Sequence, residues 1–288
     1  MEIGIGLPNV VRGTSGAVFR AWARRAEERG FAGLSTIDRI AYPSHDSLTA
    51  LSVAAGATDR IRLVSGILLG PVYAPALLAK ASATLHSMSG GRLTLGLGVG
   101  IRQDDFDTVQ RPFHTRGRDF DAALELMHRA WSGEPVGASP LPICPPLPDG
   151  DRVPIIMGGS TELAVQRAVR WGEGYIAGGG GPGFVAPMIE RVRAAWKDSG
   201  RGGEPRIGAL AYFAVGADAV QAGASNLLGY YAFTGPYDAQ QVADSMLTSD
   251  QAVRDAVAAF EDVGVTELYL DPAASSLDQV DQLADIVL

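Results

Sequence analysis

The feature that most constrains this sequence is a regular alternation between short apolar runs and longer stretches with helical periodicity. Short buried strands that alternate with amphipathic helices are typical of repeated βα units around a parallel sheet. Eight such runs occur, and eight parallel strands close a (β/α)₈ TIM barrel. The predicted strands are Ile3–Leu7, Gly33–Ile37, Ile61–Ser65, Leu93–Val99, Pro154–Met157, Gly174–Ala177, Ile207–Val215 and Glu267–Leu270.

The stretches between the runs carry apolar residues along one helical face. The first of them has such residues at positions i, i+3, i+4 and i+7 and stops at a glycine, which predicts an amphipathic helix with a glycine C-cap. These residues are Phe19, Trp22, Ala23, Ala26 and Gly30.

The chain length fits a single barrel. TIM barrels commonly form one domain of about 250 residues, so residues 1–288 are predicted to form a single domain with loop insertions at the C-terminal face of the barrel. The segment Ser132–Arg152 holds six of the 17 prolines and is predicted to be a surface loop. The segment Asn226–Leu247 is predicted to add helices before the last βα unit.

Charge and composition narrow the possible partners. The formal net charge is -8 and the pI is about 5.0, which argues against nucleic acid or an anionic membrane surface as a partner. The N-terminus has neither a basic segment nor a long apolar stretch, so we expect a cytoplasmic protein. A single cysteine, Cys144, excludes an internal disulfide, and the four histidines lack the spacing of metal ligands.

In a barrel of this kind, catalytic and binding residues follow the C-terminal ends of the strands. Gly158, Gly159, Ser160 and Thr161 stand between the fifth strand and a helix, where backbone N–H groups and two hydroxyls predict a phosphate site. A plain turn in which Ser160 or Thr161 caps the helix is the alternative.

Two further strand ends carry candidate binding residues. Gly178 and Gly179 follow the sixth strand, where the absence of side chains lets a ligand approach the backbone. Arg102 follows the fourth strand, and with Arg116 or Arg118 it could bind phosphate oxygens. Alternatively, these arginines pair with nearby aspartates on a solvated face.

Asp38 and Arg39 follow the second strand, where a substrate or a cofactor ring would lie. We predict that they are catalytic, together with His45, a loop histidine that could act as an acid or a base. An ion pair between Asp38 and a neighbouring arginine is the plain alternative. His114 is also placed on a loop.

The region around the fourth strand resembles the central signature of the luciferase-like monooxygenase superfamily. The resemblance is carried by Leu77–Lys80 and Thr84–Gly100, with Ser89–Leu93 as its most specific part, and by Pro154–Ser160. It implies a bacterial luciferase-like barrel, often dimeric, that uses reduced FMN or coenzyme F420 as an oxidoreductase or monooxygenase on a small organic molecule. A separate flavin or deazaflavin reductase would then be a partner.

The same resemblance assigns roles to individual residues. It implies that Gly158–Thr161 and Arg102 contact the cofactor phosphate. Arg118, which matches the family pattern less well, is implied as a further contact. Ser65, Gly66 and Ile67 match the segment under the cofactor ring, where many members carry a non-proline cis peptide. One departure concerns the second strand end, where many members have Asp-His or His-His and this chain has Asp38-Arg39.

Two other classes of function compete with the oxidoreductase. The departure at Arg39 allows a non-catalytic flavin-binding barrel. A cofactor-free barrel lyase or isomerase could use Asp38, Asp104 or Asp105 with a histidine. The sequence lacks a Gly-x-Ser-x-Gly motif and a P-loop, and Gly96–Gly100 has the wrong spacing for a dinucleotide-binding turn, so neither a serine hydrolase nor a Rossmann enzyme is indicated.

Overall fold

The strands form a closed parallel barrel in a computed structural model that describes residues 1–148, 150 and 152–288. Within these residues, nine strands follow the order β3-β2-β1-β9-β8-β7-β6-β5-β4, and pairing of β3 with β5 closes the sheet. The strands are β1 (Glu2–Gly6), β2 (Gly33–Thr36), β3 (Arg62–Ser65), β4 (Leu68–Leu69), β5 (Leu93–Gly98), β6 (Ile155–Gly158), β7 (Gly174–Ile176), β8 (Arg206–Phe213) and β9 (Glu267–Pro272). All eight predicted strands and the TIM barrel are confirmed, and the two-residue β4 is an addition.

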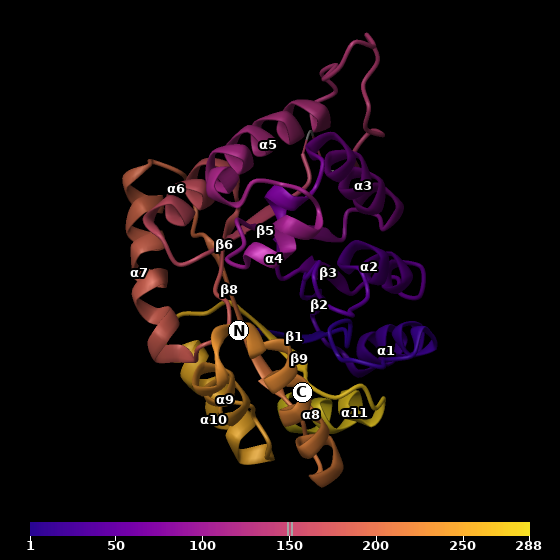
Figure 1. Ribbon diagram of the computed structural model, residues 1–288, viewed down its shortest axis with the longest axis vertical. Coiled ribbons are helices and arrows are strands. Elements are labelled where there is room, and N and C mark those ends of the chain that lie inside the picture. Colours follow the sequence, from indigo (N-terminus) through magenta and orange to yellow (C-terminus); the bar gives the residue numbers. More distant parts are fainter. Residues whose placement is uncertain (149, 151) are drawn as a thin grey trace.

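Helices surround the strands on all sides (Figure 1). They are α1 (Gly16–Arg29), α2 (Ser47–Ala55), α3 (Pro75–Met88), α4 (Gln103–Thr108), α5 (Arg116–Trp131), α6 (Glu162–Trp171), α7 (Pro182–Asp198), α8 (Ala217–Tyr230), α9 (Pro236–Asp244), α10 (Asp250–Asp262) and α11 (Asp278–Val287). None of the helices in the described ranges is long and apolar enough to cross a bilayer.

The first helix shows how local sequence sets these boundaries. Ser15 caps α1 by accepting a hydrogen bond from the Ala17 N–H, and Gly30 ends it in the left-handed conformation at φ 95°. Phe19, Trp22 and Ala26 lie on the buried face, together with Ala23, as the spacing predicts.

The N-terminal half of the barrel interior is filled by side chains. The Tyr269 ring lies so close to Gly4 that a Cβ there would stand 2.5 Å from it. The Tyr269 hydroxyl donates to Glu267, whose carboxylate also accepts from Arg206 Nε at 2.6 Å. Because this end is packed, we expect a ligand site at the C-terminal ends of the strands.

The irregular segments follow the predictions with one correction. The described residues of Ser132–Arg152 contain no helix or strand, and positions 149 and 151 lie outside the description. The segment Asn226–Leu247 contains the end of α8, a 3₁₀ turn at Ala232–Thr234 and α9, as predicted. His114 was placed on a loop but belongs to a 3₁₀ turn, Phe113–Thr115, because Pro112 precedes a turn that leads directly into α5.

Candidate functional site

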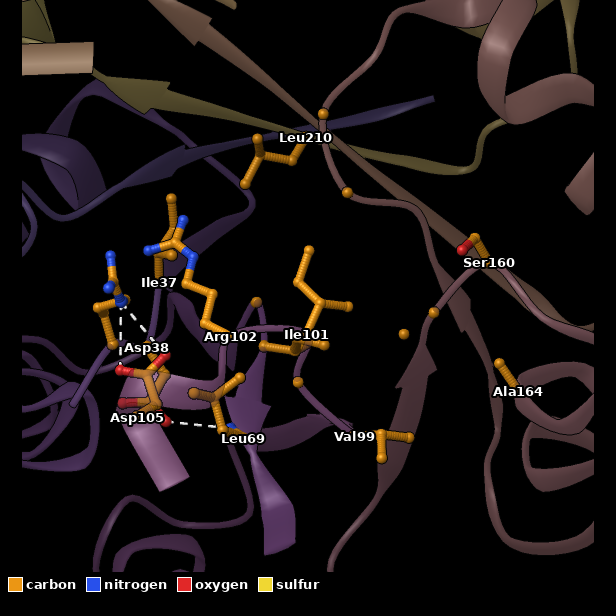
Figure 2. A pocket seen from close by; sticks show the side chains of 18 of the residues that line it. Ile37, Asp38, Leu69, Val99, Ile101, Arg102, Asp105, Ser160, Ala164 and Leu210 are labelled. Atoms are coloured by element: carbon orange, nitrogen blue, oxygen red, sulfur yellow. Dashed lines mark hydrogen bonds and ion pairs between the residues drawn. The ribbon is translucent and has the colours of Figure 1, made fainter. Parts of the chain in front are cut away.

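A cavity of about 530 Å³ opens at the C-terminal ends of the strands (Figure 2). Its walls come from segments that follow β2, β3, β5, β6 and β7, from β8, and from the end of α8. The lining residues used below are Ile37, Asp38, Arg39, Gly66, Ile67, Leu69, Arg102, Asp105, Arg116, Gly158, Gly159, Ser160, Thr161, Gly178, Gly179, Leu210, Tyr212, Tyr230, Tyr231 and Phe233.

One side of the cavity is formed by a cis peptide bond between Gly66 and Ile67, as the family resemblance implies. The Ile67 side chain packs against two glycines of neighbouring strands, Gly98 and Gly158, where a Cβ would stand 2.1 Å and 2.6 Å from its Cδ1 atom. Ser65 lies outside the cavity lining, because its buried hydroxyl donates to the Gly96 carbonyl at 2.9 Å. The predicted contact of Ser65 with a cofactor is therefore not supported by its position.

The Gly158–Thr161 turn lines the cavity and leads into α6. Thr161 is the N-cap of α6, since its hydroxyl accepts from the Ala164 N–H. The alternative in which a residue of this turn caps the helix is therefore correct for Thr161. Gly159 has φ 134°, a conformation that favours glycine, and Ser160 remains exposed to the cavity. The turn thus presents the first turn of a helix and the exposed Ser160 hydroxyl to the cavity.

A second cavity of about 720 Å³ adjoins the first. The two share the cis peptide, the Gly158–Ser160 turn, Gly178 and Gly179 as lining residues. No neighbouring atom lies within 4 Å of a Cβ built at Gly178, so this glycine faces open space. Together the cavities offer room for an elongated molecule that passes along the glycine-rich ends of β6 and β7.

The three candidate arginines occupy different places. Arg116 lines the cavity, where its guanidinium donates to the Gly100 and Phe113 carbonyls. Arg118 is outside the lining, with its side chain 81% exposed and 3.5 Å from the Asp119 carboxylate. Arg102 lines the cavity, but its side chain extends towards Ile37, whereas Ser160 lies on the opposite side (Figure 2). The structure therefore brings Arg116, not Arg118, to the cavity, and it separates Arg102 from Ser160.

Asp38 is a buried carboxylate at the cavity wall. It accepts hydrogen bonds at 3.0 Å from the Leu69 N–H and from the Tyr73 hydroxyl. Burial raises the pKa of Asp38 to about 6, although these two hydrogen bonds act in the opposite direction. No arginine pairs with Asp38 within the described residues, so the ion pair considered as its plain alternative is wrong.

Arg39 is paired with two acids. Its Nε lies 3.1 Å from Asp105 Oδ1, and its Nη2 pairs with Asp104. Asp105 also accepts from the N–H groups of Ile40 and Ala41, so the loop after β2 is fastened to α4. The Arg39 and Asp105 side chains are only 6% and 1% exposed, which makes this a buried ion pair.

His45 does not reach the site. It is exposed, packs against the Phe19 ring at 4.8 Å between centroids, and lines neither cavity. None of the chain's histidines, all of which are described, lines these two cavities. The lyase alternative therefore lacks the histidine that it requires at this place.

Four aromatic residues form an aromatic wall of the cavity, and none of them was among the predicted site residues. Tyr212 on β8 shares a hydrogen bond of 2.9 Å with Tyr231, and Tyr230 and Phe233 lie beside Tyr231. The sequence signal was the run of aromatic residues between 230 and 233, which lies in the segment for which only additional helices were predicted. Tyr212 gave no signal, because an aromatic residue is ordinary within a strand.

The family model for luciferase-like monooxygenase matches residues 1–270 of this chain. The chain belongs to the luciferase-like monooxygenase family. This confirms the resemblance deduced from Ser89–Leu93 and Pro154–Ser160.

Curated relatives of this luciferase-like protein differ in their cofactors. An uncharacterized protein of Mycobacterium tuberculosis is 27% identical over 213 residues, which are 62% of this chain and 71% of the relative. The FMNH2-dependent dimethylsulfone monooxygenase of Pseudomonas putida is 25% identical, over 58% of this chain and 48% of that protein. The F420-dependent glucose-6-phosphate dehydrogenase of Nakamurella multipartita is 30% identical, over 54% and 50%.

Solved structures share the fold of this luciferase-like protein over its whole length. The monooxygenase RslO1 from Streptomyces bottropensis superposes with a TM-score of 0.80 at 22% identity, covering 99% of this chain and 97% of that one. An F420-dependent secondary alcohol dehydrogenase gives a TM-score of 0.79 at 18% identity, covering 100% and 98%. At these identities the likeness shows the fold.

Proposed function

We propose that this protein is an oxidoreductase that binds reduced FMN or coenzyme F420 at the C-terminal end of the barrel and acts on a small organic molecule. The observation that carries the proposal is the exposed Ser160 turn at the N-terminus of α6, which adjoins the Gly66–Ile67 cis peptide in one cavity. Family membership supports it. Relatives that use FMNH2 and F420 are both present, so the proposal includes both cofactors.

The phosphate of the cofactor fits the Gly158–Thr161 turn. Both cofactors carry a ribityl phosphate, and a helix N-terminus favours an anion because backbone N–H groups and the helix dipole point towards it. The Ser160 hydroxyl would donate one hydrogen bond, and Arg116 would supply positive charge. Gly178 and Gly179 leave the backbone open to the elongated part of the cofactor.

The cofactor ring, when bound, supplies hydride transfer or oxygen activation. The protein supplies the surroundings: Gly66 and Ile67 line the place for the ring, and the aromatic wall excludes water. Asp38, with a pKa of about 6, would hold or accept a proton beside the substrate. Arg39 acts as a positioning residue, because Asp105, one of the two acids that it binds, also accepts from the Ile40 N–H in the loop after Asp38.

Further parts of the proposal concern the protein as a whole. We propose a homodimer, as the family resemblance implies, and a location in the cytoplasm. A separate reductase would supply the reduced cofactor, as the family resemblance implies.

Replacing Ser160 by alanine is expected to weaken the binding of reduced FMN by about tenfold to a hundredfold, the cost of one hydrogen bond to a charged group. Reduced riboflavin, which lacks the phosphate, should bind the variant and the wild type equally well. Anaerobic titration of the apo-protein, followed by cofactor absorbance and fluorescence, measures both affinities.

Arg116→Ala and Arg118→Ala form a matched pair for the same titration. The first should weaken FMN binding and the second should not, because only Arg116 lines the cavity. Equal binding of FMN by the wild type and Ser160→Ala would place the phosphate elsewhere and contradict the proposed site.

A further inference from the structure

Arg102 is a positive charge in the cavity, and no acid among the described residues forms an ion pair with it. Its Nη1 atom is buried and has no hydrogen-bond partner among the described residues. Its guanidinium carbon lies 3.6 Å from the centroid of the Phe233 ring and 4.5 Å from that of Tyr230. Stacking on aromatic faces stabilises the cation but satisfies none of its N–H groups.

The acids near Arg102 are already engaged. Asp104 and Asp105 bind Arg39, and Asp38 accepts from Leu69 and Tyr73. Burial, together with the charge of Arg39, lowers the pKa of Arg102, and an arginine still keeps its charge at neutral pH. A half-buried cation with a buried, unused donor is costly unless a ligand completes it.

The ligand of Arg102 is not expected to be the cofactor phosphate. In Figure 2 the Arg102 side chain extends towards Ile37, on the side of Asp38, and Ser160 lies across the cavity. Arg116, which also lines the cavity, is the arginine proposed for the phosphate site. The anion that Arg102 binds must therefore belong to the molecule at the Asp38 side of the cavity.

The walls around Arg102 indicate the rest of that molecule. Tyr230 is buried, Phe233 covers the guanidinium, and Ile37, Leu210 and Tyr212 add apolar surface. We propose that Arg102 binds the carboxylate of a small, largely apolar organic acid, which is the substrate class of this oxidoreductase. This inference rests on the proposed function, since the substrate site is defined relative to the cofactor.

The test uses benzoate and benzamide, two probes of the same shape that differ in charge. Calorimetric titration of the apo-protein in a carboxylate-free buffer should show benzoate binding about ten times more tightly than benzamide or better. Arg102→Gln should abolish this preference, and Arg102→Lys, which keeps the charge, should retain part of it. Arg118→Gln, which removes an exposed arginine, should behave as the wild type.

The alternatives give different results. If benzoate binds no better than benzamide, or if Arg102→Gln leaves the preference intact, the proposal is overturned. If Arg102→Gln weakens the binding of FMN but not that of riboflavin, Arg102 binds the cofactor phosphate. The carboxylate proposal is then overturned, while the proposed function stands. Because the probes are titrated without cofactor, a failure of FMN to bind the wild type is a separate result that concerns the proposed function alone. Thermal unfolding of each variant shows that it is folded.

Discussion

Arg39→Leu is expected to lower the free energy of unfolding by about 3 to 5 kcal/mol, the usual cost of breaking a buried ion pair from one side. The substitution leaves the Asp105 carboxylate, which is 1% exposed, without its cation. Its remaining partners are the N–H groups of Ile40 and Ala41. Urea denaturation followed by far-UV circular dichroism measures the loss.

The control for this prediction is Arg118→Leu. Arg118 is 81% exposed and its pair with Asp119 is a surface contact, so the loss should stay below about 0.5 kcal/mol. The double variant Arg39→Leu/Asp105→Asn should recover part of the loss, because the charge left behind is then gone. If Arg39→Leu lowers the free energy of unfolding no more than Arg118→Leu does, the Arg39–Asp105 pair does not hold the loop after β2.

Asp38→Asn is expected to remove a pH dependence of stability worth about 3 kcal/mol. The pKa of Asp38 is raised from 3.8 to about 6 in the folded protein, mainly by burial. Each unit of difference between the folded and unfolded pKa corresponds to about 1.4 kcal/mol. Asparagine can still accept the hydrogen bonds from Leu69 and Tyr73 without carrying a charge.

The sign follows from proton binding. Between pH 4 and pH 6 the folded protein holds a proton on Asp38 that the unfolded chain has lost, so this carboxyl lowers stability as the pH rises to about 6. Urea denaturation at several pH values should show the wild type losing stability relative to Asp38→Asn across this interval, with no further change above it. Asp107→Asn, at an exposed position, is the control. A constant difference between wild type and Asp38→Asn would mean that the carboxyl is charged throughout.

The barrel was predictable because parallel strands are buried on both faces. Such strands appear as short apolar runs, and Leu93–Val99 or Gly174–Ala177 can be recognised without knowing what they pair with. The glycines at strand ends were also informative, since Gly158 and Gly178 stand where β6 and β7 meet the cavity. Periodicity does not show a two-residue strand, which explains why β4 was missed.

The charged residues were harder to place, because their positions depend on contacts far apart in sequence. Arg39 and Asp105 are 66 positions apart, and no local pattern links them. The sequence did contain a signal that separates Arg116 from Arg118. Arg116 stands four residues before the buried Phe120 and so lies on the same face of α5, whereas Arg118 lies on another face. The direction of the Arg102 side chain depends on the aromatic residues that follow α8, which only the structure brings to it.

The central claim is that the cavity at the C-terminal end of the barrel binds a flavin or a deazaflavin. Its most direct test is a parallel titration of the purified apo-protein with FMN and coenzyme F420, each in its oxidised and reduced form. We predict that at least one of the four binds with a dissociation constant well below a millimolar, a limit that corresponds to about 4 kcal/mol. If none of the four binds below that concentration, the protein is not the oxidoreductase proposed here.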